Sequence, residues 1–545
     1  MAGYKSFKDP IYGYIEIDNH IINTVIDTPE FQRLRNVIQT SYSPLYSSAV
    51  HNRFVHSLGV YHLGRFLSSS IQKKRSDSLC KAMTKEEVSR CFELFELACL
   101  LHDVGHAPFS HTGEEFYLKN GDRKELHKEI INLTNDQDLK MEIREKAANY
   151  KAAPHELMSV IVGLKIYADQ FRSDEEKSFF SRCITGYSYA IKTDEKHSFL
   201  NCLISFLNSS VIDVDKLDYL IRDAYITGFD TINIDYKRLL TSINVKKING
   251  TYEVVFMKGA ISVIENVVYA HDAERKWIQN HPIVQYEGYL LKNIIMELNK
   301  KYSGKHLFSY KALTRSGITL SKKYRVSLLC DADIIFLLKN LEGNTNVKEL
   351  FDRSSRRHPI WKSESEYKAL FDTCFNNQTY DVLDTEMDDL FKYLNYLNSA
   401  QTINEETLKA CEEDIKSYEA VVSSGTADSS LEEQIACKKR FQEWIRVFEK
   451  FAKCQGIEFD FVILKQDQFN SGFAKTKFSE LRIKFPELEN VCHFGKVTNV
   501  LSAQKSLREK FFYVFYRRET NANKELDVFK LIDGLNELAK QKTMQ

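Results

Sequence analysis

Three histidines and an aspartate stand within twelve residues of the chain, LLHDVGHAPFSH at 100–111. His102 and Asp103 are adjacent and directly follow the apolar run FELACLL. Polar side chains at the end of such a helix must be hydrogen-bonded, paired or bound to a metal. Two adjacent side chains at a helix end can both face a cleft, so the pair indicates a metal site whose other ligands come from elsewhere.

Histidines are concentrated in the same part of the chain, with seven of the fifteen between residues 51 and 127. Fe, Mn and Zn bind imidazole nitrogens and carboxylates, and a hydrolytic site leaves a coordination position for water. A single histidine is more often a hydrogen-bonded structural residue. The cluster as a whole, rather than any one member, therefore predicts metal chemistry.

A second polar feature lies in VIDVDKLDYLIRDAYITG, residues 211–228. At about 100° per residue, Asp215, Tyr219 and Asp223 fall within one arc of about 80° on a helix. Such a face makes a wall for a polar ligand, and Lys216 at its border can meet a phosphate. The alternative is a surface helix with paired charges such as Asp218 and Arg222. The apolar residues between them favour burial, and a buried carboxylate needs a partner, for which a metal is suitable.

Composition limits the possible classes of protein. The 545 residues include 75 basic and 75 acidic side chains, so the net charge of zero gives no indication of a nucleic-acid partner. No run of 18 apolar residues occurs, MAGYKSFKDPIYG lacks the apolar core of a signal peptide, and eleven cysteines form no CxxC pair. We therefore expect a cytoplasmic protein with reduced thiols and no membrane partner.

The elements that position these residues are predicted to be mostly helices, since the chain has only eight prolines and 21 glycines. INVKKINGTYEVVF predicts a β-hairpin that turns at Asn249-Gly250. Further strands are expected at 324–329 and 459–465. The apolar spacing between 402 and 454 predicts two helices that form a hairpin, for which simple packing is the preferred interpretation. A chain of this length is expected to form more than one packed unit.

The motifs HNRFVHSLGV, LLHDVGHAPFSH and DVDKLDYLIRD, in this order, resemble the H…HD…D signature of the HD-domain metal phosphohydrolases. More narrowly they resemble the deoxynucleoside triphosphate triphosphohydrolases, and DPIYGYIEID and IDTPEFQRLRNVIQ extend the likeness. The resemblance covers most of 9–515, weakly between about 345 and 455. It implies a mainly α fold with an HD-domain helical core and a small β-hairpin at 1–300. A mixed α+β C-terminal lobe at 301–545 would carry the helical hairpin.

The resemblance also implies a site. Four residues correspond to the family's metal ligands: His56, His102, Asp103 and Asp215. The metal would be Fe, Mn or Zn, with Mg possible on the substrate phosphates. Four residues correspond to its catalytic groups near the phosphates: His106, His111, Glu114 and His155. His111 and Glu114 would form a relay that protonates a leaving oxygen, although Asp103 is an alternative partner for a histidine.

Substrate contacts follow in the same way. Arg53 corresponds to a phosphate-binding arginine, and Gln39, Tyr219 and Asp223 correspond to residues around the deoxyribose. Tyr219 would exclude a 2′-hydroxyl by packing against C2′. In AHDAERKWIQNHPIVQ, which aligns ambiguously with a substrate helix of the family, Arg275 is the candidate for a phosphate contact. His271 and His281 are the alternatives.

A regulatory nucleotide is a further expectation from the resemblance. Asp27, Gln32 and Arg35 correspond to residues that hold an activating guanine nucleotide between subunits, which implies a homo-oligomer. An ordinary ion pair at a helix start explains Asp27 and Arg35 equally well. Lys8 stands where the family has a neutral polar residue, which favours an altered or absent effector site.

Three functions remain open on the sequence. The first is metal-dependent hydrolysis of deoxynucleoside triphosphates (dNTPs) to deoxynucleoside and inorganic triphosphate. The second is another HD phosphohydrolase or phosphodiesterase acting on cyclic or modified nucleotides or on nucleic-acid ends. The third is a nucleotide-sensing protein whose hairpin at 402–454 docks a partner. The complete set of metal ligands argues against the third, because a sensor has no need of an open metal position.

Overall fold

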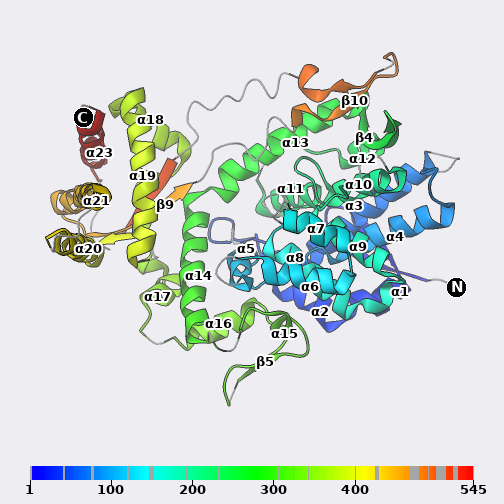
Figure 1. Ribbon diagram of the computed structural model, residues 1–545, viewed down its shortest axis with the longest axis horizontal. Helices are drawn as coiled ribbons and strands as arrows, with labels where there is room; N and C mark the ends of the chain where they lie inside the picture. Colours follow the sequence, from blue (N-terminus) through cyan, green and yellow to red (C-terminus); the bar gives the residue numbers. More distant parts are fainter. Residues whose placement is uncertain are drawn as a thin grey trace. The chain divides into compact units, whose positions relative to one another are not determined.

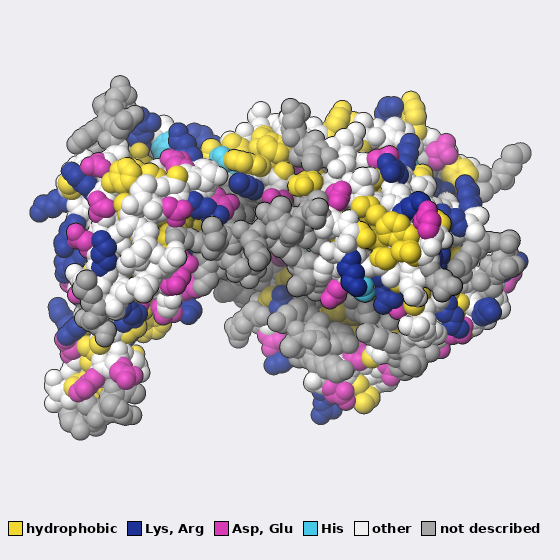
Figure 2. Space-filling view, turned by 90° about the horizontal axis from the view of Figure 1, so that it is seen from above, with side chains coloured by type: hydrophobic (Ala, Val, Ile, Leu, Met, Phe, Trp, Pro, Cys, Tyr) yellow, Lys and Arg dark blue, Asp and Glu magenta, His cyan; other side chains and the backbone are white. Residues whose placement is uncertain are grey.

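The computed structural model describes residues 3–40, 43–74, 79–118, 122–145, 152–190, 194–229, 233–302, 304, 306–322, 324–341, 343–398, 401–423, 429–466, 478–488, 490–498, 511–518 and 526–543. As the resemblance implied, the fold is mainly α with small sheets. Among the described helices, none combines the length and the apolar character needed to cross a membrane. Basic and acidic side chains are interspersed over the face that Figure 2 shows.

The chain forms two compact units, each built from separate stretches of sequence. The first comprises Met1–Gln279, Ile294–Glu342 and Ser471–Lys505, and the second comprises Asn280–Asn293, Gly343–Asn470 and Ser506–Gln545. This division differs from the single boundary expected at residue 300. Two later segments join the first unit through specific contacts: β10 (Arg482–Lys484) pairs in parallel with β4 (Thr251–Met257), and Asp331 accepts hydrogen bonds from the backbone of Ile38 and Phe109.

Helices make up most of the first unit (Figure 1). They are α1 (Asn19–Ile21), α2 (Pro29–Gln32), α3 (Arg53–Lys73), α4 (Lys85–Leu101), α5 (His111–Glu114), α6 (Lys124–Thr134), α7 (Gln137–Glu145), α8 (Pro154–Ile166), α9 (Asp174–Thr185), α10 (Glu195–Leu207), α11 (Val214–Thr227), α12 (Tyr236–Thr241), α13 (Ile261–Glu274), α15 (Tyr310–Leu313) and α16 (Asp331–Lys339). The core lies around α8. Every residue of this helix from Leu157 to Leu164 is buried, as expected of a helix that is mostly apolar on all sides. Helix α14 (Pro282–Lys301) contains the division between the units.

Three small sheets complete the first unit. The predicted hairpin is confirmed as β3 (Ile243–Ile248) and β4, with Asn249 and Gly250 at φ 50° and 88°. Positive φ at both turn residues matches the right-handed twist of paired strands, which explains the Asn-Gly sequence. The sheet order is β11 (Cys492–His493), β10, β4, β3, and separate pairs join β1 (Tyr4–Asp9) to β2 (Gly13–Asp18) and β5 (Ile318–Thr319) to β6 (Arg325–Val326).

The strand expected at 324–329 is therefore shorter than predicted. Beyond Val326 the chain leaves the extended conformation, because Leu328 adopts φ 54° and its N–H donates to the carbonyl of Thr314. The strand expected at 459–465 is confirmed as β9 (Asp460–Gln466).

The second unit combines helices with one antiparallel sheet. Its strands follow the order β7 (His358–Pro359), β12 (Phe511–Tyr516), β9, β8 (Thr402–Asn404). Its helices are α17 (Thr345–Phe351), α18 (Glu364–Cys374), α19 (Asn377–Asn398), α20 (Glu405–Ser423), α21 (Ser429–Gln455) and α23 (Phe529–Thr543). Helices α20 and α21 pack against each other, which confirms the predicted helical hairpin, although 424–428 lie outside the described residues.

One buried arginine ties three segments of the first unit together. Arg33 is 3% exposed, and its guanidinium donates to the carbonyls of Leu329, Val104 and His106 at 2.9 Å each. The last two carbonyls belong to the loop that carries the His-Asp pair. A buried carbonyl without a donor costs about 1–3 kcal/mol. An apolar residue at position 33 would leave these carbonyls without a donor, so Arg33 stabilises the loop after α4.

We expect Arg33→Met to lower the free energy of unfolding by about 3 kcal/mol or more, because three buried carbonyls lose their donor. Chemical denaturation followed by circular dichroism measures the change. Arg35→Met, an exposed position two residues away, is the matched control. A denaturation midpoint for Arg33→Met equal to that of the control would contradict the assignment.

Candidate metal centre and adjoining histidine cluster

The four predicted metal ligands meet at the ends of three helices. His56 lies in the first turn of α3, His102 and Asp103 follow the last turn of α4, and Asp215 lies in the first turn of α11. From His56 Nε2 the distances are 3.3 Å to His102 Nε2, 3.7 Å to Asp103 Oδ2 and 3.0 Å to Asp215 Oδ1. His102 Nε2 is 3.6 Å from Asp215 Oδ1.

The helices begin and end here for local reasons. The side chain of Asn52 accepts from the N–H of Val55 and starts α3. The side chain of Asp213 accepts from the N–H of Lys216 and starts α11. These caps satisfy backbone donors that a helix start leaves open. Each ligand therefore stands on a rigid helix terminus.

Both imidazoles present the same nitrogen to the centre. His102 Nδ1 lies 2.9 Å from the carbonyl of Cys99, and His56 Nδ1 lies 2.7 Å from Asp218 Oδ2. A proton on Nδ1 satisfies each contact and leaves Nε2 with its lone pair, as metal-binding histidines require. Asp103 Oδ1 is buried and has no hydrogen-bond partner. Two imidazoles and two carboxylates, one of them with a buried oxygen that makes no hydrogen bond, suit a divalent Fe, Mn or Zn ion.

Asp218 and Arg222 belong to a buried helix, as the apolar residues of this segment favoured, and not to the surface helix of the alternative interpretation. The pair with Arg222 exists, but the two residues are only 0% and 1% exposed. Arg222 donates to both carboxylate oxygens of Asp218, Tyr12 Oη donates at 2.7 Å, and Asp9 accepts from Arg222 at 2.9 Å. The buried charge is thus paired and hydrogen-bonded, the condition under which burial of an ion is tolerated.

Close packing of α3 on α11 brings Asp218 to His56. A Cβ on Gly59 would lie 1.9 Å from Asp218 Oδ1. Any other residue at position 59 would displace either the carboxylate or the helix. Gly59 in HSLGV therefore allows the close approach of α3 and α11.

Electrostatics keep the carboxylate ligands charged. Burial raises the pKa of Asp103, but Arg53 and His102 outweigh it and hold the pKa well below the usual range. Burial also opposes ionisation of Asp215, and His102 and His56 again lower its pKa well below the usual range. Contacts with Asp215 and Asp218 overcome burial and raise the pKa of His56 to about 10, so binding of a metal at Nε2 releases a proton from this ring. The anionic ligands are ionised at neutral pH.

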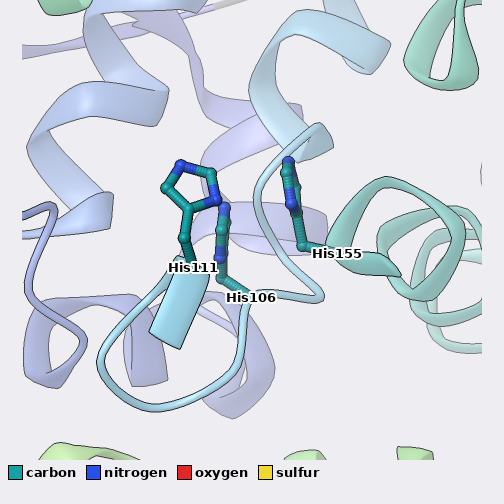
Figure 3. A group of neighbouring side chains, drawn as sticks. All are labelled: His106, His111 and His155. Atoms are coloured by element: carbon teal, nitrogen blue, oxygen red, sulfur yellow. The ribbon is translucent and has the colours of Figure 1, made fainter. Parts of the chain in front are cut away.

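A second group of histidines adjoins this centre. His106, His111 and His155 each offer a nitrogen within 4.8 Å of the others, and Figure 3 shows the rings close together. The rings of His106 and His155 stack at 3.9 Å between centroids. His106 Nε2 lies 3.2 Å from Asp103 Oδ1, so Asp103 lies next to both groups. A group of imidazole nitrogens at this spacing is able to bind a metal ion or phosphate oxygens, and its role here stays a prediction.

Glu114 orients two members of this group. Its carboxylate contacts His111 Nδ1 at 3.1 Å and also contacts His155 Nδ1. Burial opposes the charges, but the pairing lowers the pKa of Glu114 and raises the pKa of His155 to about 9. The His111–Glu114 contact of the predicted relay is present, with His155 as a second partner, while the relay's role in catalysis stays a prediction.

Arg53 makes contacts within the chain that the resemblance did not imply. Each of its three guanidinium nitrogens has an acceptor in the chain: Asp103 Oδ2 at 2.7 Å, Ser110 Oγ at 2.9 Å and the carbonyl of Gln39 at 3.2 Å. In this structure Arg53 holds Asp103, and its contact with a phosphate stays a prediction. Gln39 is 5% exposed, with no hydrogen bond to its side-chain oxygen.

The remaining substrate candidates lie along and beside α11. Asp223 Oδ1 lies 2.7 Å from His51 Nε2, a partner that the sequence analysis did not assign. Lys216 Nζ donates to Asp213 and to the carbonyl of Ser209, so its ammonium already has acceptors. Tyr219 is partly buried, and Arg275 begins a π-helix at 275–279 that follows α13. The alternatives His271 and His281 lie in α13 and immediately before α14.

The three regulatory candidates interact only in part. Arg35 Nε donates to Gln32 Oε1 at 2.8 Å, and its guanidinium lies 3.6 Å above the Phe54 ring. Gln32 Nε2 donates to the carbonyl of Ile26, and Asp27 is exposed. Within the described residues no ion pair joins Asp27 to Arg35, while the hydrogen bonds of Gln32 and Arg35 fit a structural role for these two residues. A nucleotide site at these residues stays a prediction.

Comparison with known proteins agrees with this geometry. Residues 53–173 match the HD domain. "Deoxynucleoside triphosphate triphosphohydrolase SAMHD1" of Xenopus laevis is 34% identical over 242 residues, 43% of this chain and 36% of that protein. "Uncharacterized protein MG461" of Mycoplasma genitalium is 31% identical over 263 residues, 48% and 52% of the two chains. The chain carries an HD domain and resembles the dNTP triphosphohydrolases, as its motifs predicted.

The fold also resembles that of a solved structure. A hypothetical protein from Aquifex aeolicus superposes with a TM-score of 0.54 at 19% identity, covering 98% of this chain and 100% of that one. The chain spans about half of the length of the Mycoplasma relative and about a third of the length of the Xenopus relative.

We expect Asp218→Asn to weaken metal binding by about 10–100-fold, because the loss of the carboxylate removes the charge that orients His56. Metal content after dialysis against a weak chelator measures the effect. Asp223→Asn, at the other end of α11, is the control and should retain metal. Full metal content in Asp218→Asn would show that the contact with His56 does not support the site.

Proposed function

We propose that this chain is a metal-dependent phosphohydrolase that converts dNTPs to deoxynucleoside and inorganic triphosphate. The convergence of His56, His102, Asp103 and Asp215, with both Nε2 atoms turned toward the carboxylates, carries the proposal. Inward Nε2 atoms and ionised carboxylates form a complete ligand set for one divalent cation. The HD domain match supports the same assignment.

The chain's own residues divide the work of hydrolysis. A divalent cation supplies Lewis acidity and makes water nucleophilic near neutral pH. Arg53 keeps Asp103 ionised and fixed in position. Glu114 contacts Nδ1 of His111 and of His155, which aims the Nε2 side of each ring away from the carboxylate. An imidazolium so held donates its proton to the leaving oxygen, which is general acid catalysis. The side chain of His111 is 67% exposed and accessible to a substrate.

Selection of deoxyribose would depend on residues that follow Asp215 along α11. Asp215, Tyr219 and Asp223 succeed one another by one turn each, about 6 Å apart along the helix. With the phosphate at Asp215, the sugar of a nucleotide meets Tyr219, and Asp223 with His51 lies beyond it. The Xenopus relative bears a dNTP triphosphohydrolase name, which supports this substrate class. A homo-oligomer and an activating nucleotide at Asp27, Gln32 and Arg35 belong to the same proposal.

Product analysis tests the reaction. Incubation with dNTPs, NTPs or cyclic nucleotides plus Mn, Fe or Mg should yield inorganic triphosphate from dNTPs, and Asp103→Asn should lose both bound metal and turnover. Anion-exchange chromatography identifies the products. Nucleoside monophosphate as the product would instead favour an HD phosphodiesterase that acts on cyclic nucleotides or nucleic-acid ends. Nucleotide binding without hydrolysis in the presence of Mn, Fe or Mg would favour a nucleotide-sensing protein.

The sugar preference is tested separately. Hydrolysis of dGTP should exceed that of GTP, and Tyr219→Ala should narrow the difference by about tenfold or more because the crowding at C2′ is removed. The ratio of kcat/KM for the two nucleotides is the measurement. Tyr225→Ala, an exposed position on the same helix, is the control. Equal rates on dGTP and GTP in the unmodified enzyme would contradict the exclusion of a 2′-hydroxyl by Tyr219.

A further inference from the structure

A groove lies along α3, on the part of the helix that is C-terminal to the metal ligand His56. Its volume is about 560 Å³, and it is bordered by β2, α3 and Thr241 at the end of α12. This volume falls in the range of pockets for small molecules, ~300–1,000 Å³. All of its lining belongs to the first unit, and no residue assigned above to the metal centre or histidine cluster lines it.

The chemistry of the groove changes along its length. Two rows of side chains four residues apart on α3 begin at Tyr61 and His62 and end at Lys73 and Lys74. Twelve residues of helix cover about 18 Å. Aromatic rings lie at the first end, where Tyr14 joins from β2, and ammonium groups lie at the other. Ser69 and Ser70 provide small hydroxyl groups between the two ends.

Part of this surface is available to a ligand. Tyr14 is 66% exposed, with Lys8 Nζ 4.3 Å from its ring centroid. Lys74 Nζ is occupied by the carbonyls of Thr241 and Ile243. Lys73 is exposed and makes no hydrogen bond or ion pair with the described residues. Arg65, midway along the groove, donates to the carbonyl of Glu16 and lies 3.8 Å from the carboxylate of Glu96, which offsets part of its positive charge.

We propose that this groove binds a phosphorylated, ring-bearing small molecule of the nucleoside diphosphate type. The rings of Tyr14 and Phe66 offer stacking surfaces for the ring of the ligand, and Lys73 with Arg65 attracts its phosphates. Stacking alone and charge alone are each weak at an exposed site. A ligand that carries both a ring and phosphates uses both ends of the groove and therefore binds more tightly. An uncharged aromatic ligand leaves the cationic end unused, and a bare anion leaves the aromatic end unused.

The groove connects with the metal centre through one tyrosine. The ring of Tyr12 lies 4.9 Å from that of His62, which lines the groove. Tyr12 Oη donates to Asp218, and Asp218 contacts His56 Nδ1. A ligand that shifts His62 therefore acts on the group that orients a metal ligand. Coupling of this kind is reciprocal, so the ligand and the metal change each other's affinity by the same factor.

Calorimetric titration of the full chain tests the binding site. The probe is α,β-methylene adenosine diphosphate, which resists hydrolysis, with adenosine and inorganic pyrophosphate as its two halves. Ser69→Trp fills the middle of the groove and should weaken probe binding at least tenfold. Gln72→Trp, on the same helix but outside the groove, should leave it unchanged. Lys73→Glu should weaken binding about tenfold without adding bulk, which covers the case in which Ser69→Trp fails to fold.

The outcomes separate the parts of the proposal. No binding by the unmodified chain, or equal binding by Ser69→Trp, overturns the site. Pyrophosphate binding as tightly as the probe overturns recognition of the ring, and adenosine binding as tightly overturns recognition of the phosphates. These measurements require no turnover, so they stand or fall apart from the proposed hydrolysis.

The coupling has its own measurement. Mn²⁺ affinity should change about fivefold or more when the probe is saturating, and Tyr12→Phe should keep probe binding while removing that change. An unchanged Mn²⁺ affinity in the unmodified chain overturns the connection through Tyr12.

Discussion

The contact between His56 and Asp218 is the interaction on which the candidate site depends. Both side chains are 0% exposed, so the bond operates where water does not compete for either partner. It assigns the proton to Nδ1 and so frees Nε2, and it places a negative charge behind a metal ligand. That charge is tolerable in the interior only because Arg222 and Tyr12 donate to it. Gly59 permits the approach of α3 and α11 that brings the pair together.

Asp103 connects the metal centre to the histidine cluster. One oxygen is bound by Arg53, and the other has no hydrogen bond and lies 3.2 Å from His106 Nε2. The backbone around this residue is held in turn by Arg33, which accounts for the carbonyls on either side of Gly105. A Cβ at Gly105 would lie 2.2 Å from the backbone nitrogen of Ser159 in the buried helix α8. The loop therefore packs directly on the core.

The sequence predicted what local pattern and motif order determine. The Asn249-Gly250 hairpin, the paired helices near 402–454 and the meeting of four ligands all depend on signals that are contained in short segments. The role of Asp218 was missed because an aspartate and an arginine four residues apart look the same on a surface helix and on a buried one. The division into units was missed because a three-residue strand such as β10 has no periodicity from which pairing with β4 can be predicted. The contacts of Arg53 with Ser110 and Gln39 were not predicted, because a sequence does not show how many acceptors a guanidinium already has.

The two histidine groups differ in what holds their Nδ1 atoms, and this difference suits them to different work. In the metal centre one Nδ1 faces a backbone carbonyl and the other faces Asp218, partners that lie in or beside rigid helices. In the adjoining cluster two Nδ1 atoms share one carboxylate, that of Glu114, so a proton on either ring is stabilised by the same charge. Fixed, separately held imidazoles favour ligation, which requires a constant tautomer. Imidazoles that share one anion retain a proton at neutral pH, as the pKa of His155, raised to about 9, indicates, and a retained proton is what the proposed general acid requires.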